Sequence, residues 1–198
     1  MTSNNNQYDV AIVGSGLLGQ ICAKVCSQFD LRTLVIDSKS DNEFSFNAIS
    51  FDDESLRLLK GIGLYDSIKG FLNKPDFTDI VLTNGRVIQR NPVLNTNNGF
   101  PSICTFFLPE IEQIIREICK ADKHIDLLVD SELINFNLIG NKVEIDTKSG
   151  SYLNHFEAAY LIACDGINSF IRHKLDIASI DQRYSKNWLL VDIVLKHE

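Results

Sequence analysis

Residues 8–37, YDVAIVGSGLLGQICAKVCSQFDLRTLVID, decide the fold of this chain. The four apolar residues from Val10 to Val13 form the kind of run expected for a strand that is buried on both faces. The glycine-rich segment 14–19, GSGLLG, follows directly, and then come a helical pattern and a second apolar strand that ends at Asp37. The order strand, tight turn, helix, strand predicts a Rossmann-like α/β unit.

Each glycine of this turn meets a different requirement of nucleotide binding. Gly14 permits the sharp turn out of the strand, Gly16 lets a diphosphate approach the bare backbone, and Gly19 allows the helix to lie close to the sheet. Asp37 comes eighteen positions after Gly19, near the roughly 20 residues expected for the acid that hydrogen-bonds an adenosine ribose. The alternative is an α/β unit whose glycines only make a turn.

Composition limits the classes of partner. The chain has 198 residues, 44% of them hydrophobic, and a formal net charge of −7, so it can build a core but offers no basic field for nucleic acid or anionic lipid. No apolar run approaches the length of a membrane-spanning helix, and the polar segment MTSNNNQ does not resemble a signal peptide. We therefore expect a soluble, cytoplasmic protein without nucleic-acid or membrane partners.

The five cysteines show no spacing typical of a zinc site or a disulfide framework. Cys22 and Cys26 lie four residues apart and share a helix face, but no histidine or acid joins them there. We interpret them as small apolar groups that pack the helix on the sheet, and we expect no metal site.

The rest of the chain predicts further helices and strands. Acidic residues and an apolar stripe indicate a helix that begins near Asp52, and the stripe after Pro109 indicates another. A short helix is expected at 65–71 and a last one at 169–175, with Asn168 as its cap. Strands are expected at 78–82 and 86–89, joined by Asn84-Gly85, and then at 125–129, 133–138, 142–147, 152–158, 160–163 (buried) and 188–196.

Several of these segments resemble a known family. The glycine turn, the segment 162–172, IACDGINSFIR, and the distance between them resemble the flavin-dependent aromatic hydroxylases of the p-hydroxybenzoate hydroxylase class. The segments 48–57, AISFDDESLR, and 188–193, WLLVDI, are similar to the 3-(3-hydroxyphenyl)propionate hydroxylase branch. The resemblance covers essentially the whole chain, but only the amino-terminal half of such an enzyme.

The resemblance implies a cofactor site and a reaction. FAD would be reduced by NAD(P)H and, after adding dioxygen to the flavin, would pass one oxygen atom to the ring of a phenolic acid. The ADP part of FAD would be held by Gly14, Ser15, Gly16, Leu18, Gly19 and Asp37, and Asp165 and Gly166 would form a DG motif near the diphosphate. Asp-Gly is also an ordinary turn between a strand and a helix. No catalytic side chain is expected, and the four histidines are interpreted as surface or structural residues.

The chain departs from the family pattern at several positions. Asn47 stands where this branch usually has an arginine, and Leu108 where it usually has a glutamine. Leu17 replaces a proline of the turn, and Asp30 replaces the glycine that usually ends the first helix in a left-handed conformation. The second acidic motif of the family, Gly-Asp, does not occur in these 198 residues.

We therefore expect an α/β, Rossmann-like FAD-binding domain with a β-meander, plus part of a β-rich substrate domain. Residues 1–74 and 102–178 would form the first, and 75–101 and 179–198 would be incomplete segments of the second. Exposed strands in these segments would favour a homodimer or a second chain that supplies the missing half. Two alternatives stay open: a truncated, non-catalytic nucleotide-binding relative, and an NAD(P)-dependent Rossmann dehydrogenase.

Overall fold

The computed structural model of this chain describes residues 6–40 and 48–180, together with Leu189, Val191 and Ile193. The helices are α1 (Leu17–Ser27), α2 (Asp53–Gly61), α3 (Tyr65–Ile68), α4 (Leu108–Lys120) and α5 (Phe170–Lys174), with a 3₁₀ turn η1 (Lys69–Phe71). The strands are β1 (Gln7–Val13), β2 (Thr33–Ile36), β3 (Ser50–Asp52), β4 (Phe77–Val81), β5 (Val87–Pro92), β6 (Ile103–Thr105), β7 (Ile125–Leu128), β8 (Glu132–Ile139), β9 (Lys142–Ser149) and β10 (Tyr152–Ala163).

The largest sheet has six strands in the order β7-β2-β1-β10-β9-β8. β1 pairs in parallel with β2 on one side and with β10 on the other, and β7 extends the parallel part beyond β2. β8, β9 and β10 form an antiparallel meander. The expected α/β fold with a β-meander is confirmed.

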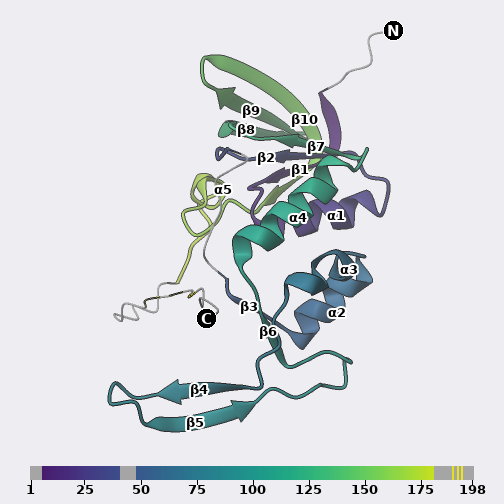
Figure 1. Ribbon diagram of the computed structural model, residues 1–198. Coiled ribbons are helices and arrows are strands. Elements are labelled where there is room, and N and C mark those ends of the chain that lie inside the picture. Colours follow the sequence, from purple (N-terminus) through teal and green to yellow (C-terminus); the bar gives the residue numbers. More distant parts are fainter. Residues whose placement is uncertain (1–5, 41–47, 181–188, 190, 192, 194–198) are drawn as a thin grey trace.

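The central strand β1 contributes to a core on each face of the sheet. Val10 and Ile12 belong to the cluster packed against α1 and α4, whereas Ala11 and Val13 belong to the cluster on the opposite face. This alternation is the two-residue period of a strand, and it explains why the run reads as continuously apolar. Figure 1 shows α1 and α4 side by side along one face of the sheet.

One expectation about the meander is wrong. The segments 152–158 and 160–163 form a single strand of 12 residues, β10. Its first part pairs with β9 as far as Ala158, whereas its last part pairs only with β1 among the strands that the structure describes. Tyr160 is consequently 70% exposed, so the end of β10 is not the buried strand that its apolar composition predicted.

Smaller expectations have mixed outcomes. Ser169, not Asn168, caps α5, because the Ser169 hydroxyl accepts a hydrogen bond from the N–H of Arg172 at 3.0 Å. Asp30 has φ +55°, as expected for a residue in place of a helix-ending glycine. Cys22 and Cys26 pack against the core between helix and sheet, as expected. Most of the predicted strand 188–196 lies outside the described residues.

The predicted hairpin around Asn84-Gly85 is confirmed and forms a sheet of its own. Among the described residues, β4 and β5 pair only with each other, and Gly85 has φ +84°. Figure 1 shows the hairpin extending away from α2 and the short sheet β3-β6, on the side opposite the six-stranded sheet.

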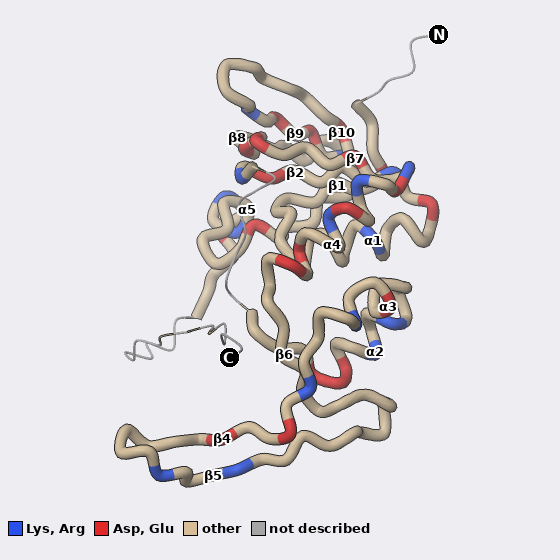
Figure 2. Tube along the Cα trace, in the orientation of Figure 1, with Lys and Arg blue, Asp and Glu red and all other residues tan. Residues whose placement is uncertain are grey.

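Charge is distributed over the described part of the chain without a basic stripe (Figure 2). Figure 2 shows Lys and Arg interspersed with Asp and Glu on most elements. None of the described helices is long and apolar enough to cross a membrane.

Candidate nucleotide site

The parallel strands β1, β2 and β10 end at one edge of the sheet, where the described residues form a cleft of about 900 Å³. Its walls come from the glycine turn, the segment after β2, the segment after β10 and the start of α4. The carboxyl ends of parallel strands are the usual ligand site of open α/β sheets. All predicted cofactor-binding residues except Ser15 line this cleft.

Two glycines of the turn are required by close backbone contacts. Gly14 has φ +101°, and a Cβ atom there would lie 2.2 Å from the carbonyl oxygen of Cys164. A Cβ at Gly19 would lie 1.8 Å from the carbonyl oxygen of Gly14. Neither distance is possible for a real atom, so these positions fix the turn against β10 and α1 against the turn.

Gly16 is different, because a Cβ there would collide with no backbone atom. It is the N-cap of α1, with extended backbone angles, and the nearest atom to a Cβ there would be Oε1 of Glu112 at 3.6 Å. A helix start with bare backbone facing an open cleft suits an anionic group. Leu18, 62% exposed, lines the same cleft.

Asp37 lies beside this turn at the end of β2. Its Oδ2 accepts hydrogen bonds from the backbone N–H of Ser15 at 2.5 Å and from the Ser15 hydroxyl at 2.8 Å. Its Oδ1 accepts one from the N–H of Lys39 at 2.8 Å. The carboxylate is therefore fixed in orientation while still lining the cleft.

Asp165 and Gly166 follow β10 on the other side of the cleft. Gly166 has φ +83°, which makes the turn after the strand. Asp165 Oδ2 accepts a hydrogen bond from the N–H of Ile171 at 3.2 Å and so supports the start of α5. The Asp-Gly pair thus makes a strand-to-helix turn and also faces the cleft.

Two charged residues of the cleft were missed by the sequence analysis. Glu112 and Arg116 of α4 are 2% and 4% exposed and line the cleft. Oε1 of Glu112 accepts a hydrogen bond from the N–H of Leu17, the first residue of α1, at 3.0 Å. They lie four residues apart within the apolar stripe of α4, and that interruption was the signal that could have identified them.

Other described side chains near the cleft offer no reactive group. Leu108, where the family pattern has a glutamine, is buried and lines the cleft, whereas Asn47 lies outside the described residues. Burial, followed by the neighbouring Cys22 thiol, raises the pKa of Cys164 to about 12, so its thiol stays protonated at neutral pH. No histidine of the described residues lines the cleft. Within the described ranges no three His, Cys, Asp or Glu side chains are grouped to hold a metal ion.

Comparison with known proteins gives a family match over most of the chain. Residues 7–198 match the family model described as FAD binding domain. The chain is 27% identical over 191 residues to a 3-(3-hydroxy-phenyl)propionate/3-hydroxycinnamic acid hydroxylase of Escherichia coli O157:H7 (strain EC4115 / EHEC), and 26% identical to the protein of the same name from strain K12. These matches cover 96% of this chain and 34% of each relative, so the chain spans about a third of the length of the relatives.

Solved structures of similar fold agree with this match. The p-nitrophenol 4-monooxygenase PnpA from Pseudomonas putida DLL-E4 superimposes with a TM-score of 0.80 at 20% identity, over 86% of this chain and 44% of that protein. The flavin-dependent monooxygenase PieE, solved in complex with FAD and substrate, gives a TM-score of 0.77 at 16% identity, over 89% of this chain and 33% of its own. At these identities the likeness establishes the fold.

Proposed function

The chain belongs to the FAD-binding domain family, and on this basis we propose that it is the FAD-binding portion of a flavin-dependent aromatic-ring monooxygenase. FAD, the cofactor expected from the sequence, agrees with this family. The observation that carries the proposal is the cleft at the carboxyl ends of β1, β2 and β10, bounded by the glycine turn on one side and by Asp37 on another.

The residues of the cleft suit the ADP part of FAD. Gly16 lines the cleft and has no Cβ, which lets a diphosphate approach the start of α1, where backbone N–H groups favour negative charge. The carboxylate of Asp37 is an acceptor for a ribose hydroxyl. Asp165 and Gly166 line the same cleft, and by the family resemblance they would lie near the diphosphate and the approach of the pyridine nucleotide.

Bound FAD supplies the redox chemistry with NAD(P)H and dioxygen, and the protein supplies binding and orientation. The turn fixes the diphosphate, Asp37 fixes the adenosine, and the apolar surface of Leu108 excludes water from that wall of the cleft. No side chain of this cleft is needed as a nucleophile.

The remaining parts of the site belong to a second unit in this proposal. Residues 1–74 and 102–178 form the FAD-binding domain, and 75–101 and 179–198 contribute to a substrate domain for a small phenolic acid. The separate β4-β5 sheet supports this division. A homodimer, or a chain that carries the rest of the substrate domain, would complete the site, and we place the protein in the cytoplasm.

Titration with FAD tests the proposal. We expect the chain to bind FAD with a yellow spectrum when the remaining substrate segments are supplied, and to oxidise NADH or NADPH faster in the presence of a phenolic acid. Tight binding of NADH without flavin would favour a dehydrogenase instead. Flavin binding without any nicotinamide oxidation would favour a non-catalytic nucleotide-binding relative, an alternative that Leu108 supports because it lacks an amide.

A further inference from the structure

A buried polar network lies directly beneath the glycine turn. Gln20 and Ser15 are 1% and 2% exposed. The side-chain amide of Gln20 donates from Nε2 to the carbonyl oxygen of Ser15 at 2.7 Å. The N–H and hydroxyl of Ser15 in turn donate to Oδ2 of Asp37. Helix, turn and strand end are therefore connected through one residue, Ser15.

The bond from Gln20 sets the direction of a backbone amide. The peptide bond between Ser15 and Gly16 is trans, so its C=O and N–H point to opposite sides. Because Gln20 holds the C=O on the buried side, the N–H of Gly16 is directed to the side of the cleft that Gly16 lines. Gln20 thus orients a donor toward the place of the diphosphate.

The bonds from Ser15 set the direction of the carboxylate. An ionised carboxylate has about four acceptor positions, and three on Asp37 are occupied by Ser15 N–H, Ser15 hydroxyl and Lys39 N–H. Both positions used by Ser15 lie on Oδ2, so the remaining acceptor position is on Oδ1. Ser15 does not line the cleft, so it acts through Asp37.

We propose that Ser15 and Gln20 are positioning residues of the nucleotide site: Ser15 orients Asp37 for the adenosine ribose, and Gln20 orients the Gly16 amide for the diphosphate. This inference rests on the proposed function and deepens it. The two roles differ in the part of the ligand that they affect, and this separates them experimentally.

The other polar atom of the Gln20 amide, Oε1, is buried and makes no hydrogen bond with the described residues. Gln20→Leu leaves the buried carbonyl oxygen of Ser15 without its donor, so we expect some loss of stability. The positioning role predicts a loss of nucleotide affinity larger than this loss of stability explains.

The test compares ADP with 2′,3′-dideoxy-ADP by calorimetric titration of the full chain. Ser15→Ala should weaken the binding of ADP about tenfold and the binding of dideoxy-ADP about twofold or less, because only ADP has ribose hydroxyls for Asp37. Gln20→Leu should weaken the binding of both nucleotides about equally. In an Asp37→Asn background, Ser15→Ala should leave the ratio of the two affinities unchanged, as expected for a residue that acts through Asp37.

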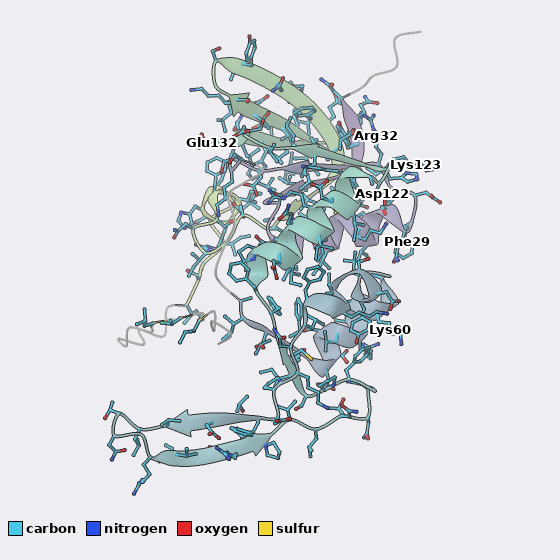
Figure 3. The ribbon with its side chains drawn as sticks, in the orientation of Figure 1. Phe29, Arg32, Lys60, Asp122, Lys123 and Glu132 are labelled. Atoms are coloured by element: carbon cyan, nitrogen blue, oxygen red, sulfur yellow. The ribbon has the colours of Figure 1, made fainter. Side chains whose placement is uncertain are left out.

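Matched controls lie at the other end of α1. The Ser27 hydroxyl donates to a carboxylate oxygen of Asp122 at 2.7 Å, and Gln28 Nε2 donates to the carbonyl of Ile62 at 3.0 Å. Figure 3 shows Asp122 and the cleft residue Glu132 at opposite ends of the sheet. Ser27→Ala and Gln28→Leu should therefore leave both affinities unchanged.

The outcomes separate the two proposals. If the wild type binds ADP and the Ser15 and Gln20 variants bind both nucleotides as it does, the positioning roles are wrong and the proposed function stands. If their affinities fall only in step with their unfolding temperatures, the two residues are structural and the inference is overturned. If the wild type binds neither ADP nor FAD, the proposed function fails and the positioning roles fail with it.

Discussion

Single atoms decide whether the glycine turn forms. Gly14 and Gly19 each lack a Cβ that would collide with a carbonyl oxygen, whereas a Cβ at Gly16 would meet nothing closer than 3.6 Å. The first two glycines are therefore needed for folding, and the third leaves room for a ligand. One sequence motif would thus serve packing and the proposed nucleotide binding through different members.

Gly19→Ala should destabilise the protein strongly. The new methyl group would lie 1.8 Å from the Gly14 oxygen, which belongs to the backbone and cannot rotate away. We expect a loss of about 3 kcal/mol in the free energy of unfolding, measured with urea. Gly61→Ala in the last turn of α2 is the control, because nothing lies within 4 Å of that position. Gly61→Ala should leave the free energy of unfolding unchanged or raise it by up to about 1 kcal/mol. Equal effects of Gly61→Ala and Gly19→Ala would contradict the packing role of Gly19.

Asp122 makes stability depend on pH at the far end of α1. Burial alone would raise its pKa, but the hydrogen bonds from Lys24 and Ser27 outweigh burial and lower the pKa from 3.8 to about 2. A lowered pKa in the folded state gives stability that is present above the usual pKa and is lost as pH falls through the folded value. The free energy of unfolding of Asp122→Asn should therefore be lower than that of the wild type by a constant amount above about pH 5. This difference should shrink between about pH 4 and pH 2. A deficit independent of pH over that range would show that the charge does not contribute.

The residues of the turn differ in how far sequence predicts them. Gly14, Gly19 and Asp37 follow from spacing alone, because the strand, turn and helix can be arranged in only one way around them. The role of Ser15 could not be predicted, because its hydroxyl meets Asp37 only after β1 and β2 pair in register. The role of Gln20 could not be predicted for a similar reason, because its position next to Gly19 in the sequence does not show that its side chain is buried.

At the scale of elements, β10 shows where local patterns fail. A single strand pairs antiparallel with β9 and in parallel with β1, so its neighbours change along its length. Its composition predicts strand correctly, but burial depends on whether β9 reaches that far, and β9 begins only at Lys142, after the turn between β8 and β9. Sequence periodicity carries no information on that distant limit.

The crossing of α4 over the start of α1 places a carboxylate beside the proposed diphosphate site. Oε1 of Glu112 accepts from the Leu17 N–H, so its negative charge faces the same helix start that would hold a diphosphate. Glu112→Gln keeps an acceptor but removes this charge, and we expect ADP affinity to rise about fivefold at low salt. Glu117→Gln, on the exposed face of α4 beside Lys120, is the control and should have no effect. Unchanged or weaker binding in Glu112→Gln would show that the charge does not oppose the ligand.

At the scale of the whole molecule, the six-stranded sheet with α1 and α4 is one body, and the β4-β5 hairpin is separate from it (Figure 1). The core clusters explain this division. One cluster joins the large sheet to α1, α2, α3 and α4 and also includes residues of β3 and β6, and the other joins the large sheet to Ile171 of α5. Neither cluster includes a residue of β4 or β5. The sequence predicted the hairpin from Asn84-Gly85, but its isolation follows only from the tertiary contacts.

Removing the hairpin tests both the domain division and the proposed self-association. The N–H of Val93 already bonds to the carbonyl of Asp76 at 2.9 Å, so Gly-Gly can replace residues 77–92 without moving the flanking chain. The unfolding temperature should change by only a few degrees and ADP affinity by less than about twofold, because the large sheet keeps its core. The deletion also removes exposed apolar side chains, among them Phe77, Ile80 and Ile88, so any dimer seen by sedimentation should weaken. Loss of ADP binding would place the hairpin within the FAD-binding domain, and an unchanged dimer would place the association surface elsewhere.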